Sequence, residues 1–214
     1  MMRFIVIIAR GIPYTLLLTV VSFAIGAALG LPLVALRRSR YAVIRALTAL
    51  IIEIVRGVPV IVWLFVVYFG LGAGVIAFTP LEAAIIVLGV TSAAYMAEIY
   101  RSGMIGLPSG QYEAAAALGL NHMTTVRLVT GPQALRIALP SAVTYLLALF
   151  KNSSVAYTIG VTEMLFWAFK ETEETLQGVL VYGIAGAYYL LMGLPLAVAS
   201  RSLDRRLRAR VATQ

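Results

Sequence analysis

One apolar segment of the chain carries polar side chains at a spacing that places them on a single helical stripe. Its members are separated by seven, three and four residues: Thr144, Lys151, Ser154 and Thr158. In a membrane-spanning helix that begins near residue 140, Lys151 would lie ~16 Å deep, close to the midplane of a bilayer. A charge at that depth is costly unless it faces water or a partner. Lys151 therefore either lines a pathway or pairs with a carboxylate of another span, while the hydroxyl groups bond backbone carbonyls.

On a pathway, this segment would bind a substrate rather than break bonds in it. The Lys151 ammonium would attract a substrate carboxylate, and its polar neighbours would add hydrogen bonds: Asn152, Ser153, Ser154 and Thr158. Glu98 is a further candidate, but it stands three residues before Arg101, a spacing that favours an ion pair within one helix. Glu163 lies near the outer end of the segment, where it meets a cationic substrate or a docking protein, or ends a solvated helix.

The residue types exclude most catalytic chemistry. There is no cysteine, so a thiolate nucleophile and a Cys-ligated metal are excluded, and the single histidine, His122, cannot build a metal cluster alone. The phosphate-loop pattern G-x-x-x-x-G-K-[ST] is absent, and the only lysines are Lys151 and Lys170. We therefore expect no catalytic residue, no metal and no cofactor in this chain.

The composition indicates that lipid surrounds most of the chain. Of its 214 residues, 61% are hydrophobic and 12% are charged, whereas a soluble domain carries roughly 25% charged residues. The formal net charge is +8, but Lys and Arg cluster between apolar runs, as they do in the cytoplasmic loops of membrane proteins. This pattern argues against nucleic acid as a partner and predicts that the arginines near the C-terminus meet anionic lipid headgroups.

Five apolar stretches are long enough to cross a membrane as helices. They lie at about residues 14–36, 47–69, 81–100, 140–162 and 177–199, in one transmembrane domain that covers residues 1–214. In the first stretch, Gly26 and Gly30 suit close packing of helices. The second is interrupted by Arg-Gly-Val-Pro, which predicts a bend because Pro59 cannot donate a backbone hydrogen bond. Glu53 and Arg56, three residues apart, are expected to pair beside that bend.

The positions of the arginines predict the orientation of these spans. Four arginines follow the first span within residues 37–45, and others lie in the 101–139 loop and in the tail after residue 200. The turn around residues 70–80 has no charge, and the loop from Glu163 to Glu174 is net acidic. We therefore predict an N-terminus outside and a cytoplasmic C-terminus, although Arg3 and Arg10 run against this assignment.

The third and fourth spans are joined by a loop that contains an alanine-rich stretch, GQYEAAAALGL at residues 110–120. Ser109 offers an N-cap for a short helix, and Glu113 lies in its first turns, where the helix dipole favours an acid. Gly119 can end this helix in a left-handed conformation. The four alanines favour a helix and add little side-chain bulk.

A second short helix is expected directly after the first. Asn121 would cap it, and it would run to Val129 and be stopped by Gly131-Pro132. Lying across the cytoplasmic face, the two helices either rest on the lipid headgroups or offer a smooth surface with one carboxylate. A groove of another protein could approach the backbone of such a surface closely.

This loop resembles the EAA loop of ABC importer permeases, whose pattern is EAA, three residues, Gly, nine residues, then I-x-L-P. The marked positions are filled in order by Glu113-Ala114-Ala115, Gly119, Val129, Gly131 and Pro132. Val129 replaces the usual isoleucine, and Gly131 departs from the pattern because it replaces a leucine. Five segments in all resemble the polar amino acid uptake branch of this family, at residues 53–59, 94–101, 110–115, 131–136 and 151–154.

The resemblance implies an all-α, type I permease subunit of an ATP-driven ABC importer for polar or charged amino acids, in the bacterial inner membrane. It would pair with a second permease, identical or different, and receive the amino acid from an extracytoplasmic binding protein. Two cytoplasmic ATP-binding subunits would bind ATP and Mg²⁺ and dock on the loop. The residues that the resemblance assigns to this coupling are Glu113, Ala114, Ala115, Gly119 and Pro132.

Two other classes of membrane protein are weighed against this one. An ion-driven secondary amino acid transporter would usually show inverted repeats and paired broken helices, whereas this chain has one broken helix and no evident repeat. A non-transporting membrane scaffold would not need Lys151 at mid-depth. Because every amino acid has a carboxylate, Lys151 does not identify which amino acid is transported.

Overall fold

The computed structural model describes residues 1–71 and 77–211, and no strand occurs in those two ranges. The helices are α1 (Met2–Ala9), α2 (Ile12–Arg37), α3 (Ala42–Gly57), α4 (Val60–Phe65), η1 (Val66–Leu71), α5 (Pro80–Ile105), α6 (Gly110–Ala117), α7 (His122–Thr124), η2 (Thr125–Thr130), α8 (Gly131–Asn152), η3 (Ser153–Ile159), α9 (Met164–Thr175) and α10 (Gly178–Val211). Here η1 and η2 are π-helical and η3 is a 3₁₀ helix.

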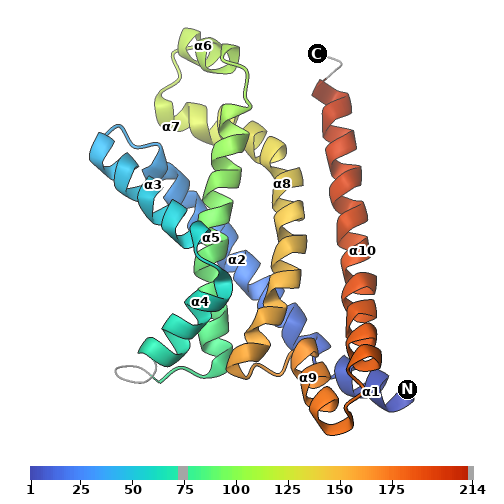
Figure 1. Cartoon of the computed structure of the whole chain (residues 1–214). Helices are drawn as coiled ribbons and strands as arrows, with labels where there is room; N and C mark the ends of the chain where they lie inside the picture. The colour runs from blue at the N-terminus through green and yellow to red at the C-terminus, as the bar shows by residue number, and fades with distance from the viewer. Residues whose placement is uncertain (72–76, 212–214) are drawn as a thin grey trace.

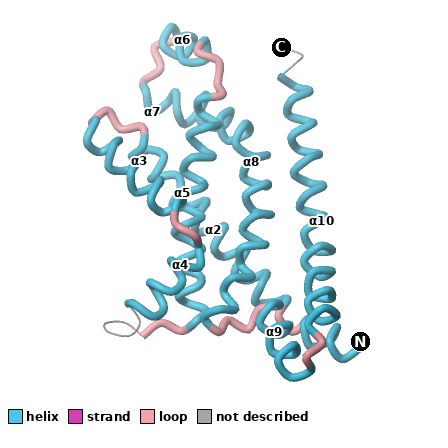
Figure 2. The backbone as a smooth tube through the Cα atoms, viewed as in Figure 1, coloured by secondary structure: helices cyan, strands magenta, loops and turns pink. Residues whose placement is uncertain are grey.

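The long helices α5, α8 and α10 run along the length of the molecule, with α2 crossing behind them (Figure 1). The small helix α6 lies at one end, and α1 and α9 lie together at the other end (Figures 1 and 2). The end with α6 also holds the last turns of α10, so the two chain termini lie at opposite ends of the molecule.

Four helical stretches are long and apolar enough to cross a membrane, at Met2–Arg37, Pro80–Ile105, His122–Ile159 and Gly178–Leu203. A fifth crossing results if the bent pair Ala42–Gly57 and Val60–Leu71 is counted as one span. The five apolar stretches seen in the sequence therefore all correspond to helices. Each helix extends beyond its apolar stretch at one end or at both ends, into the more polar residues that flank the stretch.

The bend predicted in the second span is confirmed, and its angle is 97°. α3 ends at Gly57, and Pro59 stands in an extended conformation before α4 begins. Trp63 on α4 donates from its indole nitrogen to the carbonyl oxygen of Val55 at 3.2 Å, which ties the two arms of the bend together. The expected pair between Glu53 and Arg56 is also present, with 3.8 Å between its charged atoms.

Small residues let α2 and α5 pack closely, as the sequence suggests for Gly26 and Gly30. A Cβ atom on Gly26 would stand 2.3 Å from the Cβ of Ser92, and one on Gly30 would stand 2.8 Å from the Cβ of Met96. Real carbon atoms do not approach this closely, so only glycine fits at these contacts. This contact surrounds the buried centre of α5, which includes Ser92 and Met96.

We expect Gly26→Ala to lower the free energy of unfolding by about 1–3 kcal/mol, because the added methyl group forces the two helices apart. The measurement is the apparent melting temperature of the detergent-solubilised protein. Gly183→Ala on α10 is the matched control, since a Cβ there meets nothing within 4 Å. Equal melting temperatures for the two variants would contradict the close contact between α2 and α5.

The expectation that Gly131-Pro132 stops the second short helix is wrong. Asn121 caps the helix as predicted, accepting from the amide of Thr124 at 2.9 Å, but the helix continues through η2 into α8. Pro132 does not stop the helix, because it falls in the first turn of α8, where its missing N–H is tolerated. The π-helical turn η2 connects this turn to the preceding helix without a loop. Gly131 is required in that turn, since a Cβ there would lie 2.3 Å from the carbonyl oxygen of Val126.

Candidate functional site

The alanine-rich helix α6 projects from one end of the molecule (Figure 1). Gly119 ends the turn that follows it with a φ of 69°, which confirms the predicted left-handed conformation. Ser109 stands at the N-cap position, but its side chain accepts no capping hydrogen bond there. Instead Gln133 on α8 holds the helix by donating to the side-chain oxygen of Gln111 at 2.9 Å.

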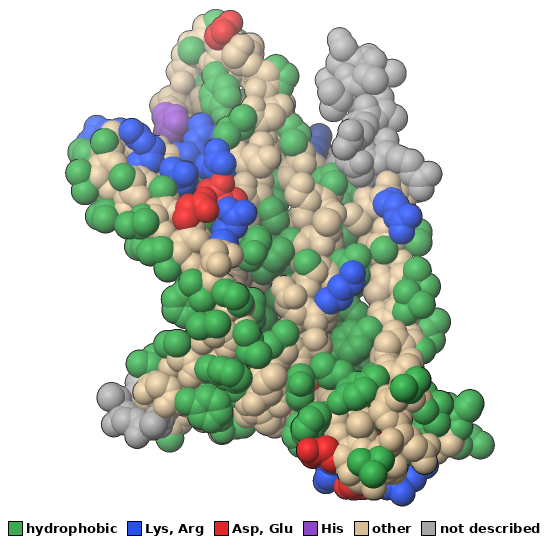
Figure 3. Space-filling model, viewed as in Figure 1, with side chains coloured by type: hydrophobic (Ala, Val, Ile, Leu, Met, Phe, Trp, Pro, Cys, Tyr) green, Lys and Arg blue, Asp and Glu red, His purple; other side chains and the backbone are tan. Residues whose placement is uncertain are grey.

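One face of α6 is free to meet another molecule. Ala115 is buried, whereas Glu113, Ala114, Leu118 and Gly119 are exposed. Figure 3 shows the acidic side chain of this helix at its tip, away from the charged residues below it. Most of the exposed surface is therefore small and flat, with one carboxylate and one large apolar side chain, Leu118.

Pro132 lies outside this helix, at the start of α8. It lines a groove of about 390 Å³ together with Arg127 of η2 and Tyr100 of α5. The groove joins the π-helical turn to the end of α5, so Pro132 belongs to the connection between the loop and the spans rather than to the exposed face of α6.

Below the loop, acidic and basic side chains gather where α3 meets α5 (Figure 3). Glu98 forms the expected ion pair with Arg101 at 2.7 Å, and a second one with Arg37 of α2 at 3.5 Å. The guanidinium of Arg56 lies over the ring of Tyr95, 5.0 Å from its centre. Glu98 thus joins α2 to α5, and it lines neither of the grooves that surround Lys151.

Lys151 lies at the end of α8 and faces α10 across two adjoining grooves. Their volumes are about 420 Å³ and 290 Å³, and both are lined by Lys151, Gly186 and Tyr189. Lys151 makes no ion pair or hydrogen bond through its side chain with any residue that the structure describes, so the carboxylate partner considered from the sequence is not found there. A basic side chain is visible between α8 and α10 at mid-height of the molecule (Figure 3).

The polar stripe around Lys151 is only partly preserved. α8 ends at Asn152 and the backbone tightens into the 3₁₀ helix η3, which shifts the later side chains around the helix axis. Thr144 still faces α10, where its hydroxyl oxygen lies 2.7 Å from that of Ser200, and Ser154 lines the smaller groove beside Lys151. Thr158 lines neither groove.

The hydroxyl groups in this segment are engaged by the backbone. They donate to carbonyl oxygens three residues earlier: Ser153 to Phe150 at 2.8 Å, Ser154 to Lys151 at 2.7 Å and Thr158 to Val155 at 2.8 Å. This is the bonding expected of hydroxyl groups that pack within a bundle. Ser153 is buried and Asn152 is exposed, and only Ser154 of these lines a groove with Lys151.

Glu163 is buried where α9 begins, and it does not face the solvent. It caps α9 by accepting from the amide of Phe166 at 2.9 Å, and it also accepts from the hydroxyls of Tyr189 at 2.6 Å and Thr15 at 3.4 Å. Burial raises the pKa of the Glu163 carboxyl to about 6, against the opposing effect of the Tyr189 hydrogen bond. Three hydrogen-bond donors thus converge on this one carboxyl group.

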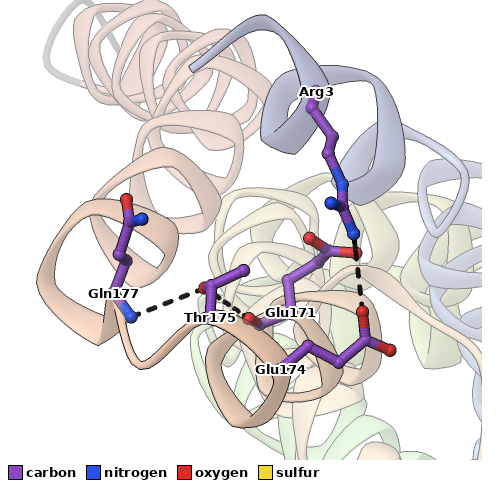
Figure 4. A network of polar contacts seen from close by, with 5 residues as sticks. All are labelled: Arg3, Glu171, Glu174, Thr175 and Gln177. Carbon is purple, nitrogen blue, oxygen red and sulfur yellow. Dashed lines mark hydrogen bonds and ion pairs between the residues drawn. The ribbon is translucent and has the colours of Figure 1, made fainter.

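A network of charges joins the first helix to α9 at the end opposite α6 (Figure 4). Arg3 of α1 reaches Glu171 and Glu174 of α9, each at 3.4 Å. Thr175 donates to the carbonyl oxygen of Glu171 at 2.6 Å and closes the end of the helix. Arg3, one of the two N-terminal arginines that run against the predicted orientation, is thus paired with acids at the same end of the molecule.

The sequence did not point to Tyr189, although it lines both grooves and contacts Glu163. It is one of three tyrosines in α10, with Tyr182 and Tyr188, and composition does not separate them. A helical-wheel comparison would have helped, because Gly186 and Gly193 lie three residues before and four residues after Tyr189 and mark the same face.

Comparisons with known proteins agree on one family over most of the chain. The family described as "Binding-protein-dependent transport system inner membrane component" matches residues 22–209. The probable amino-acid ABC transporter permease protein YckA of Bacillus subtilis (strain 168) is 44% identical over 158 residues, which are 74% of this chain and 70% of that protein. The L-cystine transport system permease protein TcyB of the same organism is 31% identical over 207 residues, covering 96% and 88%. A crystal structure of an amino acid ABC transporter with histidines matches with a TM-score of 0.89 at 30% identity, covering 96% of each chain.

Proposed function

Because this chain belongs to the family of binding-protein-dependent transport system inner membrane components, we propose that it is the permease subunit of an ATP-driven ABC importer for amino acids. The chain is a multi-pass inner-membrane protein, and it is not itself an enzyme. The relatives that span nearly its whole length include an L-cystine permease and an arginine permease. We infer a polar or charged amino acid as the substrate.

The proposed importer needs several partners, which the loop and the opposite end of the molecule would meet. ATPase subunits, two in number, would bind ATP and Mg²⁺ and receive α6 in a cleft, with the exposed residues Glu113, Ala114 and Gly119 at the contact and the buried Ala115 holding α6 from its inner face. A second permease, identical or different, would complete the pathway. An extracytoplasmic binding protein would dock at the end that holds α1 and α9. The exposed, small-residue face of α6 supports this arrangement.

The proposed orientation puts the N-terminus outside and the C-terminus in the cytoplasm. The arginine-rich segment after α2 and the helix α6 lie at one end of the molecule, as a cytoplasmic face requires (Figure 1). Arg3 lies at the other end, where its pairs with Glu171 and Glu174 offset its charge. Arg3 and Arg10 remain two arginines outside, against the four that follow the first span within residues 37–45.

The observation that carries the transport function is Lys151, a lysine without a partner among the described residues that faces two grooves in an apolar helix pair. A cation in such a place is tolerated only if it meets water or an anionic ligand. We place the amino acid carboxylate at Lys151, with Ser154 beside it and Asn152, Ser153 and Thr158 on the adjoining turns. Glu163 would support the groove wall from behind, through its hydrogen bond with Tyr189. Glu98 would hold α2 and α5 together at the end that we place in the cytoplasm, through its ion pairs with Arg37 and Arg101.

Transport would proceed by alternating access. The binding protein delivers the amino acid at the outer end, and closure of the ATPase subunits moves α6. Because α7, η2 and α8 form one continuous helical stretch, movement of the loop carries Lys151 with it. The groove would then open toward the cytoplasm and release the substrate.

Co-purification from the native membrane in a mild detergent tests this function. We expect an ATP-binding subunit to accompany the chain, and its ATPase rate in proteoliposomes to rise with one amino acid and its binding protein. A matched preparation without the binding protein serves as the control. Uptake that follows an ion gradient, with no ATPase in the complex, would instead establish a secondary transporter.

A further inference from the structure

The two grooves between α8 and α10 share a tyrosine whose hydroxyl group is hydrogen-bonded to a buried carboxyl group. Tyr189 lies on α10 and lines both grooves, together with Lys151 and Gly186. Its hydroxyl oxygen lies 2.6 Å from Oε2 of Glu163. Tyr189 therefore stands between a buried acid and the space that we assign to the substrate.

The surroundings of Glu163 decide which atom carries the proton in this contact. Its Oε1 accepts from the Phe166 amide, and its Oε2 accepts from Thr15 as well as from Tyr189. A carboxylate that only accepts has no proton to give, so the tyrosine donates its single proton to Glu163. The Tyr189 oxygen then has only lone pairs left, and it can accept but not donate a further hydrogen bond.

The other wall of the grooves is formed by Lys151, whose side chain can donate hydrogen bonds but cannot accept them. The Lys151 ammonium offers three donors and no acceptor, and no described residue neutralises it. Between the two walls, Gly186 leaves the surface of α10 open, because a Cβ there would meet nothing within 4 Å. A ligand that satisfies both walls must carry an anionic group and, close to it, N–H donors.

We propose that Tyr189 accepts a hydrogen bond from the α-ammonium group of the transported amino acid while Lys151 binds its carboxylate, and that Glu163 is the positioning residue that fixes this polarity. The inference rests on the proposed function, since it places the substrate in the groove that Lys151 faces. It accounts for recognition of α-amino acids as a class, whatever their side chain.

Direct binding to the complex of permease and ATPase subunits, without the binding protein, tests this assignment. The probes are L-glutamate, L-glutamine, L-arginine and L-histidine, each compared with its des-amino analogue, in which hydrogen replaces the α-ammonium group. The complex is held in phosphatidylcholine nanodiscs, whose quaternary headgroup has no N–H and cannot imitate an amino acid. We expect Tyr189→Phe to weaken binding of the recognised amino acid by about tenfold to hundredfold, because a hydrogen bond to a charged group is lost.

The des-amino analogue shows whether Tyr189→Phe weakens binding through the α-ammonium group or through a general change in the groove. Tyr189→Phe should leave its affinity unchanged, whereas Lys151→Ala should weaken the amino acid and the analogue alike. The control is Tyr188→Phe, which removes a hydroxyl that donates to the carbonyl of Ile5 at 3.1 Å and lines neither groove.

Three results would overturn the assignment, and they differ in their reach. Tyr189 does not bind the ammonium group if Tyr189→Phe has the affinity of the unmodified protein for the amino acid. The same conclusion follows if Tyr189→Phe weakens the amino acid and its des-amino analogue equally. In both cases the proposed pathway at Lys151 is unaffected. If Lys151→Ala also has no effect, the groove is not the binding site. If the unmodified complex binds no probe, both the assignment and the proposed pathway fail.

Discussion

Glu113→Lys should abolish stable association with the ATP-binding subunits and leave the protein in the membrane. The side chain is exposed on α6 and contributes the single acidic charge of that helix. Reversing a charge at a contact that another protein must approach closely costs several kcal/mol through repulsion and lost pairing, so we expect affinity for the ATPase to fall about hundredfold or more. Co-purification yield and ATP-driven uptake in proteoliposomes measure the effect.

A charge reversal at the other end of the molecule controls for a general effect of charge. Glu173 is also exposed, but it lies on α9, at the end opposite α6. Glu173→Lys should retain the ATPase subunits. If Glu113→Lys assembles and transports as well as Glu173→Lys does, α6 is not the docking helix.

Lys151→Ala should lower the rate of amino acid uptake by about tenfold to hundredfold without changing ATPase association. The expected loss is that of a charge-assisted hydrogen bond to the substrate carboxylate. Removing the ammonium leaves no unpaired acid behind, because no described carboxylate pairs with it. The fold should therefore tolerate the change, which a melting curve of the purified complex would verify.

The chain offers one other lysine as a matched control. Lys170 lies on α9 with its ammonium 5.8 Å from the centre of the Trp167 ring, at the end of the molecule opposite α6. Lys170→Ala removes the same charge and should leave uptake at the unmodified rate. Normal uptake by Lys151→Ala across a panel of acidic, basic and neutral polar amino acids would show that the substrate passes elsewhere.

The elements that follow from local rules were predictable from the sequence. Pro59 has no N–H, so the second span had to bend near it, and Gly119 was the residue able to take a left-handed conformation after α6. Glu98 and Arg101 could be paired because three residues along a helix bring side chains to one face. In each of these cases the relevant atoms lie within a few residues of one another.

The features that depend on contacts between helices were not predictable in the same way. Spacing within one helix does not show which face of α10 meets α8, so neither the contact from Tyr189 to Glu163 nor the groove beside Lys151 was visible. The stripe through Thr158 failed for a different reason. Its spacing assumes 3.6 residues per turn, whereas the backbone of Ser153–Ile159 forms a 3₁₀ helix with about three residues per turn.

The helical stretch from His122 to Ile159 connects the loop that contains α6 to the groove beside Lys151. Its 38 residues are helical apart from changes to a π-helical turn at η2 and to a 3₁₀ helix at η3. α7 lies across the end of the molecule and α8 runs down from it, so the stretch turns a corner near η2 (Figure 1). Because the helix is continuous around this corner, a displacement of the arm beside α6 would be passed to the arm that holds Lys151.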